Sequence, residues 1–268
     1  MSRMNFLVVV LLLFSIHLKA GEAKLLRQPA VSNNMVAFAY ANDIWTVDLS
    51  GGEARQLTTF RGREFNPMFS PDGKWIAFSG AYDGNVDVYM IPATGGTVKR
   101  LTWHPGSDIV RGWTSDGRVL FTSGRESAPI GYPKFYTISP DDAFPKAMPV
   151  PRGYRGSFSP DGKQFAYELV SPWDEEWRNY RGGQNKPVWV MNMEDYSITK
   201  VPDEKNVRNL FPVWLDNTLY FLSDRDFGMN LYSYSFSDQK LIQLTHYKEY
   251  DIKYLSAGGG KLTYTYGG

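Results

Sequence analysis

The side chains of this chain that could carry out chemistry are few, and they do not form a recognisable catalytic site. Among 268 residues there is no cysteine and there are three histidines, which excludes a thiolate nucleophile and a thiolate zinc site. His17 lies in the N-terminal apolar segment, whereas His104 and His246 each lie beside a Leu-Thr pair. We expect the latter two to be turn residues. A zinc site that combines both with distant carboxylates is the alternative.

Short motifs of the common enzyme classes are also missing from the sequence. It has no Gly-x-Ser-x-Gly elbow, no phosphate-binding Gly-x-x-x-x-Gly-Lys loop and no Gly-x-Gly-x-x-Gly loop. The acidic clusters at 174–176 and 224–226 lack the regular spacing of oxygen ligands in a calcium loop. We therefore expect no catalytic residue, no cofactor site and no metal site in this chain.

Four arginines form the one charge pattern that suggests ligand binding. Each precedes the turn Asp of one repeat, by nine, five, six and eight residues respectively: Arg63, Arg111, Arg155 and Arg208. If the repeats form a ring, these arginines lie close to the strands that line its axis, and a basic channel mouth would attract peptide carboxylates. Because the four offsets differ, solvated loop charges are the alternative interpretation.

A repeat of about 44 residues must position these side chains. The hexapeptide Phe-Ser-Pro-Asp-Gly-Lys occurs at 69–74 and 158–163, with weaker copies at 113–118 and 214–217. Each repeat continues with an aromatic strand, and several end at a Leu-Thr pair. An Asp-Gly pair between apolar runs favours a tight hairpin turn, and four strands in about 44 residues is the size of one propeller blade.

The constant order of turn motif, aromatic strand and Leu-Thr pair predicts an all-β fold, a β-propeller of four-stranded antiparallel blades. Five units span residues 25–60, 64–104, 108–151, 154–202 and 209–246, and residues 252–266 supply the first hairpin of a sixth. We predict one propeller domain at 24–268 that is incomplete at its C-terminus, and a chain that is a fragment of a longer protein.

The fourth unit contains an aromatic and basic insertion at 172–184. Its candidate interface residues are Trp173, Trp177, Arg178, Tyr180 and Arg181. These are residue types that make interface hot spots, so the loop could contact a neighbouring domain, subunit or peptide. The alternative is that the loop folds its aromatic side chains back over the edge of its own blade.

The N-terminus is typical of a secretory signal peptide. A short basic start precedes a continuous apolar run at 6–14, and small residues follow. We predict a signal peptide at 1–23, cleaved after Ala20 or Ala23, and an exported protein that is periplasmic or secreted. A retained membrane anchor is the alternative, but the apolar run is shorter than the about 20 residues of a comfortable span. The net charge of +1 gives no reason to expect a nucleic-acid partner.

Several stretches resemble the tricorn protease family. The loop Trp-Arg-Asn-Tyr-Arg-Gly-Gly at 177–183, followed by Val-Trp-Val at 188–190, is similar to a stretch of its N-terminal propeller. The opening segments at 29–31, 36–38 and 43–45 and the segment at 221–228 are also similar. The Phe-Ser-Pro-Asp-Gly repeat alone is less specific, because TolB-type propellers share it.

The resemblance implies a large, oligomeric serine peptidase that trims oligopeptides. In that family the N-terminal six-bladed propeller is thought to filter or pass peptides, and a second propeller, a PDZ-like domain and a protease core follow it. The catalytic Ser and His lie beyond residue 268, so no position here takes their roles. A non-enzymatic, TolB-like periplasmic propeller that binds a protein partner is the alternative, and the propeller of a prolyl-oligopeptidase-type enzyme is a third possibility.

Overall fold

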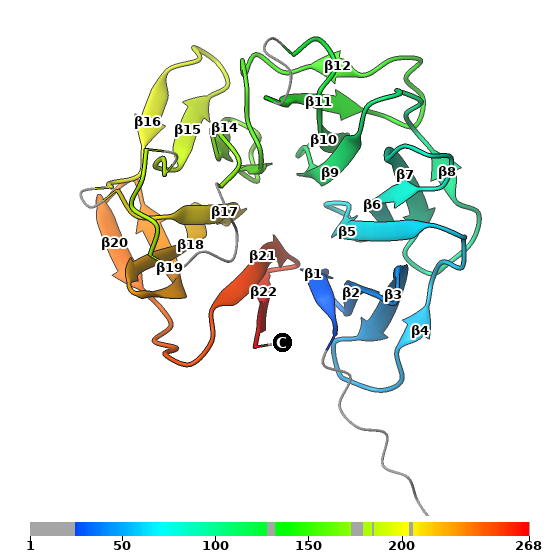
Figure 1. Ribbon diagram of the computed structural model, residues 1–268, viewed down its shortest axis with the longest axis horizontal. Helices are drawn as coiled ribbons and strands as arrows, with labels where there is room; N and C mark the ends of the chain where they lie inside the picture. The colour runs from blue at the N-terminus through cyan, green and yellow to red at the C-terminus, as the bar shows by residue number, and fades with distance from the viewer. Residues whose placement is uncertain (1–24, 128–131, 173–178, 184, 204–205, 268) are drawn as a thin grey trace, which may run out of the picture.

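The computed structural model describes residues 25–127, 132–172, 179–183, 185–203 and 206–267. These residues form 22 strands and no helix. The strands make six antiparallel sheets that surround a central axis (Figure 1). In each sheet of four strands, consecutive strands pair with one another from the axis outward.

The first three blades follow the predicted units closely. Blade one contains β1 (Arg27–Val31), β2 (Met35–Tyr40), β3 (Asp43–Asp48) and β4 (Arg55–Gln56). Blade two contains β5 (Arg63–Phe69), β6 (Trp75–Ala81), β7 (Asp87–Pro92) and β8 (Lys99–Arg100). Blade three contains β9 (Asp108–Trp113), β10 (Val119–Ser123), β11 (Lys134–Ile138) and β12 (Lys146–Ala147).

Blades four and five complete the set of four-stranded sheets. Blade four contains β13 (Gly156–Phe158), β14 (Gln164–Tyr167), β15 (Trp189–Asn192) and β16 (Ile198–Lys200). Blade five contains β17 (Asn209–Leu215), β18 (Thr218–Asp226), β19 (Gly228–Ser235) and β20 (Lys240–Gln243). The all-β fold and the five four-stranded blades are therefore confirmed.

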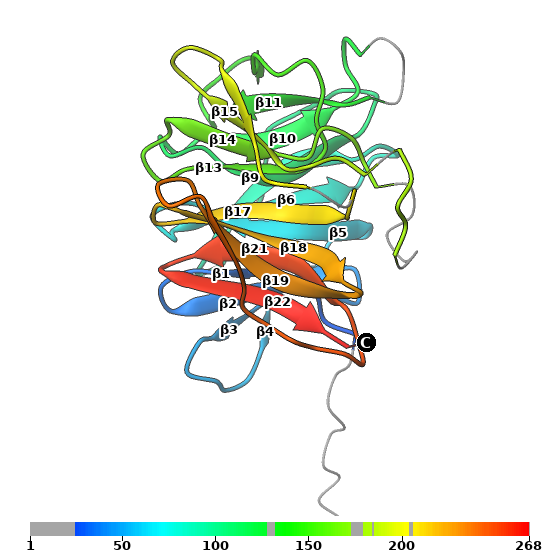
Figure 2. The ribbon, with the colours of Figure 1, turned by 90° about the vertical axis from the view of Figure 1, so that its left-hand side faces the viewer.

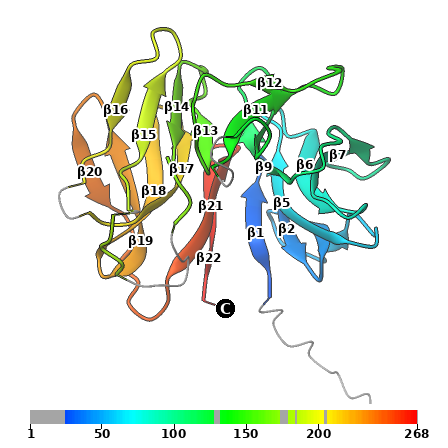
Figure 3. The ribbon, with the colours of Figure 1, turned by 45° about the horizontal axis from the view of Figure 1, so that its top comes forward.

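The last sheet is a hairpin of β21 (Ile252–Gly258) and β22 (Lys261–Tyr266). Within the part of the chain that the structure describes, no further strand pairs with this hairpin, so the sixth unit is not a full blade. It lies between β17 and β1 and brings the two ends of the described chain side by side (Figures 1 and 3). The side view shows the same hairpin among the strands of blades five and one (Figure 2).

The Asp-Gly turns of the repeat are held by the side chain of the aspartate. Asp72 Oδ1 accepts hydrogen bonds from Ser70 Oγ (2.7 Å) and from the backbone N of Lys74 (3.1 Å). Gly73, at φ 71°, supplies the left-handed conformation that follows. Asp161 accepts the same pair of bonds in blade four. The sequence motif thus encodes one local hydrogen-bonding pattern in both blades.

The Leu-Thr pairs end the repeats because the threonine hydroxyl joins two parts of a blade. Thr102 Oγ1 accepts a hydrogen bond from the backbone N of Val88 (3.0 Å) and donates to buried Asp87 (3.2 Å). In blade five, Thr245 Oγ1 accepts a hydrogen bond from the backbone N of Leu231 and donates to Asn230. In blade one, Thr58 Oγ1 accepts from the backbone N of Ile44 and donates to Glu64.

The hydrophobic core lies between neighbouring blades. One cluster joins blade two to blade three and includes Ala77, Val88, Val110 and Phe121, each fully buried. Other clusters fill the spaces between successive blades in the same manner. A single blade cannot cover both of its faces, so each depends on its neighbours. None of the described residues belongs to a helix that is long and apolar enough to cross a membrane.

Candidate functional site: the axial channel

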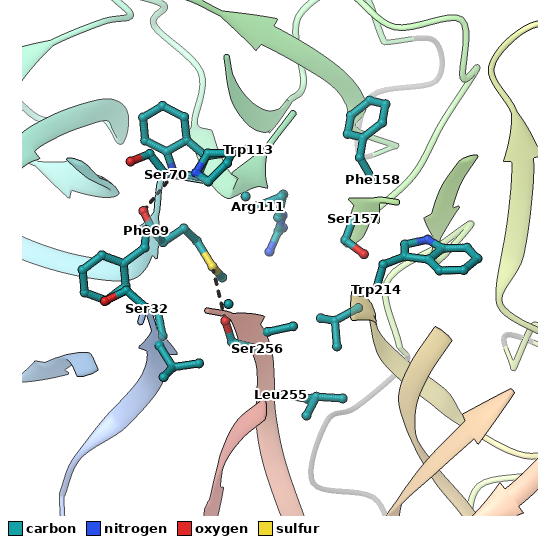
Figure 4. Close-up of a pocket in the computed structure, with 18 of the residues that line it drawn as sticks. Ser32, Phe69, Ser70, Arg111, Trp113, Ser157, Phe158, Trp214, Leu255 and Ser256 are labelled. Carbon is teal, nitrogen blue, oxygen red and sulfur yellow. Dashed lines mark hydrogen bonds between the residues drawn. The ribbon is translucent and has the colours of Figure 1, made fainter. Parts of the chain in front are cut away.

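The innermost strands of the six sheets enclose a cavity on the axis. Its volume is about 220 Å³, and residues from all six strands line it: β1, β5, β9, β13, β17 and β21 (Figure 4). The cavity is therefore a property of the closed ring, because no single blade supplies its wall.

Irregular pairing of the inner strands shapes one level of this channel. β1, β5, β17 and β21 each shift register against their neighbour, and a residue with positive φ stands at each shift: Gln28, Asn66, Phe211 and Tyr254. The pairing of β9 shifts at Arg111. A bulge bends a strand and changes the direction of its side chains. Asn66, Arg111 and Phe211 all line the cavity.

Contacts between adjacent blades connect the residues at this level. Gln28 Oε1 accepts a hydrogen bond from the backbone N of Asn66 (2.9 Å), and Asn66 Nδ2 donates to the carbonyl of Val110 (3.3 Å). On the other side, the rings of Phe211 and Tyr254 meet edge to face, with centroids 5.8 Å apart. The channel wall is thus held by direct links from one blade to the next.

Arg111 extends from β9 toward the middle of the cavity (Figure 4). Its Nε donates to Thr122 Oγ1 (3.0 Å), and its guanidinium carbon lies 4.5 Å from the ring centroid of Tyr154. Burial, and secondarily the charge of Arg155, lowers the pKa of Arg111 to about 10. The guanidinium remains positively charged at neutral pH.

Arg155 lines the same cavity and forms an ion pair with a buried acidic residue. Its guanidinium carbon lies 4.5 Å from the Tyr154 ring and 4.0 Å from the Phe211 ring. Arg155 Nη1 lies 3.4 Å from Oε2 of buried Glu168. The other oxygen of Glu168 accepts a hydrogen bond from the backbone N of Phe211 (2.7 Å). One carboxylate therefore orients Arg155 and joins blade four to blade five.

The aromatic residues of the repeat motif line another part of the cavity: Phe69, Trp113, Phe158 and Trp214. They precede the turns at the ends of four inner strands. Trp113 Nε1 donates to the carbonyl of Met68 (2.9 Å). The buried Nε1 of Trp214 has no partner among the described residues. This part of the wall is apolar. The channel wall therefore has a basic part, at Arg111 and Arg155, and an aromatic part.

The four arginines singled out in the sequence do not share one environment. Arg111 and Arg155 line the channel, whereas Arg63 and Arg208 are not among the residues of its wall. Arg63 is exposed at the start of β5, with its guanidinium carbon 4.7 Å from the Phe65 ring. Arg208 is buried, and its backbone N donates to Asp224 Oδ1 (2.9 Å). The cavity wall thus contains two of these four arginines.

The insertion in blade four contacts blade five where the structure describes it. Arg181 Nη1 lies 2.8 Å from Asp224 Oδ2, and Asn206 Nδ2 donates to the carbonyls of Arg181 (2.8 Å) and Gly182 (2.9 Å). Tyr180 is partly buried. The remaining interface candidates, Trp173, Trp177 and Arg178, lie outside the described residues.

Sequence reasoning missed Tyr154 and Glu168, which hold the arginine pair. Tyr154 directly precedes Arg155 in the sequence, but its ring contacts an arginine 43 positions earlier, Arg111. Glu168 follows the apolar strand β14 and resembles an ordinary residue at a strand end. The aromatic residues of the repeat were visible, but no local signal indicated that they line a cavity.

No metal-binding group is found in the described ranges: no three His, Asp or Glu side chains there are placed to hold a metal ion. His104 lies in the loop between β8 and β9, where its Nδ1 accepts a hydrogen bond from the backbone N of Gly106 (3.0 Å). The arrangement of the channel can bind a ligand by charge and by apolar contact.

Sheets of consecutive antiparallel strands around an axial channel define the protein as a β-propeller. The family model described as the tricorn protease N-terminal beta propeller domain matches residues 23–268. The chain therefore belongs to the tricorn protease N-terminal propeller family, and the predicted resemblance is confirmed.

Curated relatives include tricorn protease homolog 1 of Streptomyces coelicolor, which is 30% identical over 247 residues, covering 91% of this chain and 23% of that protein. Tricorn protease of Thermoplasma volcanium is 24% identical over 262 residues, covering 92% of this chain and 24% of that protein. The chain thus spans about a quarter of the length of these relatives. TolB of Francisella tularensis is 28% identical over 130 residues, which are 46% of this chain and 29% of that protein.

Solved structures show the same fold. The crystal structure of tricorn protease superimposes with a TM-score of 0.78 at 22% identity, covering 91% of this chain and 24% of that one. A putative TolB from Agrobacterium tumefaciens gives 0.67 at 19% identity, covering 83% of this chain and 81% of that one. Both families named from the sequence are therefore found among its relatives.

Proposed function

We propose that this chain is the N-terminal propeller of an exported, tricorn-like serine peptidase that degrades oligopeptides. In that protein the ring acts as a scaffold and as a selective passage for peptides. The observation that carries the proposal is the axial cavity of about 220 Å³, walled by all six inner strands, in a chain of the tricorn propeller family.

The dimensions and chemistry of the channel support selection of extended peptides. A wall that contains both arginine and aromatic side chains offers charge and apolar contact to a flexible chain. A folded domain is far too large for this cavity. The proposed partners are thus peptides in the channel and the following domains of the same polypeptide: a second propeller, a PDZ-like domain and a protease core. We further propose that the full-length protein is a homo-oligomer, as the resemblance to the family implies.

The coding sequence that follows residue 268 tests this proposal. We expect it to encode a second propeller and a serine-protease region, and the full-length product to hydrolyse short peptides more rapidly than folded proteins. A stop codon shortly after the sixth blade would contradict the proposal. An α/β-hydrolase domain in that position would instead indicate a prolyl-oligopeptidase-type enzyme.

A TolB-like, non-enzymatic propeller that binds a protein partner is the second candidate. It is favoured by the similarity to TolB of Francisella tularensis and by the shared fold of the putative TolB. Under this proposal the channel mouth holds a segment of a partner protein. A stop codon after the sixth blade, together with co-purification of one defined partner, would support it.

Export is a proposal that rests on the basic start and apolar run of the N-terminus. Fractionation of cells that express the full-length protein with a C-terminal tag tests it. We expect the tag outside the cytoplasm and a mature N-terminus at residue 21 or 24. Retention of residues 1–20 on a cytoplasmic product would contradict it.

A further inference from the structure

Two guanidinium groups share one aromatic ring in the channel wall. The guanidinium carbons of Arg111 and Arg155 each lie 4.5 Å from the ring centroid of Tyr154, and Phe211 contacts Arg155 as well. Stacking against an aromatic ring restricts the orientation of a guanidinium. The two cationic side chains are therefore held near each other before any ligand arrives.

Among the described residues, only one of the two arginines forms a close ion pair that fixes its charge at the channel wall. Arg155 pairs with Glu168 at 3.4 Å. Within the described part of the chain, no carboxylate lies within ion-pairing distance of Arg111. The residues that line the cavity include these two arginines and no Asp, Glu or Lys. The charge of Glu168 still acts on Arg111, but from beyond ion-pairing distance. A partly buried cation with no carboxylate at ion-pairing distance favours an anion beside it.

The lowered pKa of Arg111 agrees with this geometry. Burial removes water from the guanidinium, and the neighbouring arginine adds repulsion. Both effects disfavour the charged form, Tyr154 and Glu168 oppose them in part, and a bound anion would offset them further.

The remainder of the wall indicates the kind of molecule that carries the anion. Met68, Trp113 and Trp214 line the cavity with further apolar and aromatic groups. The volume of about 220 Å³ is below the roughly 300–1,000 Å³ of typical ligand pockets. An apolar wall of this size suits a short peptide segment and leaves little room for a larger ligand.

We infer that Arg111, held beside Arg155 by Tyr154, binds a carboxylate of an oligopeptide inside the channel. The carboxylate is either the C-terminus of the peptide or an Asp or Glu side chain. A guanidinium offers two parallel N–H donors to a carboxylate. Nε of Arg111 bonds to Thr122 and Tyr154 also hydrogen-bonds to this guanidinium, which leaves further N–H donors of its five for a carboxylate. This inference rests on the proposal that peptides enter the channel, and it adds the group that the channel selects.

Calorimetric titration of the purified protein with tetrapeptides tests the inference. N-acetylated Ala-Phe-Leu-Ala is titrated as the free acid and as the C-terminal amide, and N-acetylated Ala-Phe-Glu-Ala is titrated as the amide, so that no α-amino charge is present. We expect the neutral amide to bind at least about tenfold more weakly than the free acid. Strong binding of the Glu-containing amide would assign the site to side-chain carboxylates, whereas weak binding would assign it to the C-terminus.

Variants connect the preference to one side chain. Arg111→Met should abolish the preference for a carboxylate while the neutral amide binds as before. The matched control is Arg63→Met, because Arg63 also stacks on an aromatic ring but lies outside the channel wall; it should leave all affinities unchanged. If circular dichroism shows that Arg111→Met does not fold, Arg111→Lys replaces it. That variant should retain a weaker preference, because an ammonium cannot present two parallel donors.

Each contrary result has a distinct meaning. Equal binding of free acid and amide by the wild-type protein, or an unchanged preference in the folded Arg111 variant, overturns the carboxylate site and leaves peptide passage standing. Absence of binding for every peptide overturns both the site and the passage of peptides through this channel.

Discussion

Glu168 of blade four accepts a hydrogen bond from the backbone N of Phe211 in blade five, at 2.7 Å. The two residues are far apart in the sequence, and the same carboxylate holds Arg155 at the channel wall. Packing between two blades and orientation of a channel side chain therefore depend on one buried acid.

Replacement of Glu168 by Ala should lower the free energy of unfolding by about 3 kcal/mol, because it removes the buried carboxylate that pairs with Arg155 and accepts a hydrogen bond from the N–H of Phe211. Urea denaturation followed by tryptophan fluorescence measures the change. Glu194→Ala is the control, since Glu194 is exposed in the same blade, and it should change stability by less than about 0.5 kcal/mol. Equal effects of the two substitutions would show that Glu168 is not structural.

Thr102→Val should lower the free energy of unfolding by about 1–3 kcal/mol, because the valine cannot accept the hydrogen bond from the backbone N of Val88. The shape of the side chain is preserved, so the loss reports on the hydroxyl. Thr97→Val, at an exposed position in the same blade, is the control for the general effect of the substitution. Thermal unfolding of both variants decides the matter, and a Thr102 variant as stable as the control would contradict the role of the Leu-Thr pair.

Glu64→Gln should alter how stability depends on pH. Burial raises the pKa of Glu64 above its usual value, although hydrogen bonds from Thr58 and Tyr82 partly oppose this effect. A raised carboxyl pKa means that the folded state holds a proton that the unfolded state has released, so this group's contribution to stability falls as pH rises above about 4.5. Denaturation midpoints between pH 4 and pH 7 should therefore shift in favour of the variant as pH increases. A constant difference across that range would show that Glu64 does not titrate differently in the two states.

Closure of the ring can be tested at Gly258. A Cβ atom there would collide with the carbonyl oxygen of Val31, so Gly258→Ala must push the last hairpin away from blade one. We expect the free energy of unfolding to fall by about 1–3 kcal/mol. We also expect faster proteolysis within residues 252–266. Gly124→Ala is a suitable control because open space surrounds that position. Similar proteolysis of the two variants would indicate that the hairpin does not depend on this contact.

Local chemistry explains which parts of the fold could be predicted from the sequence. The turn at Asp72 and Gly73 is held by atoms within five consecutive residues, so a short motif is enough to predict it. Repetition of that motif, together with the aromatic strand of each repeat and the Leu-Thr pairs, then indicates the number of blades. The Leu-Thr pairs were also visible, although their hydrogen-bonding role depends on a strand about 14 residues away.

The channel wall could not be predicted in the same way. Arg63 begins β5 and is exposed, whereas Arg111 stands in the middle of β9 and lines the cavity. Arg111 stands where β9 shifts register, and strand register depends on pairing between strands, which a motif does not specify. Tyr154 and Glu168 act across blade boundaries, which a motif within one repeat does not report.

The position of the last hairpin against the first strand has a consequence for the order of folding. Lys261 Nζ reaches the carbonyl of Asn33 at 3.4 Å, across 228 positions of sequence. Strands within one blade pair locally and can form as the chain is synthesised, but contacts of such long range form slowly and late. The inner face of β1 therefore stays uncovered until residues 252–266 arrive, and the arginine pair stands in a complete channel only after that final docking step.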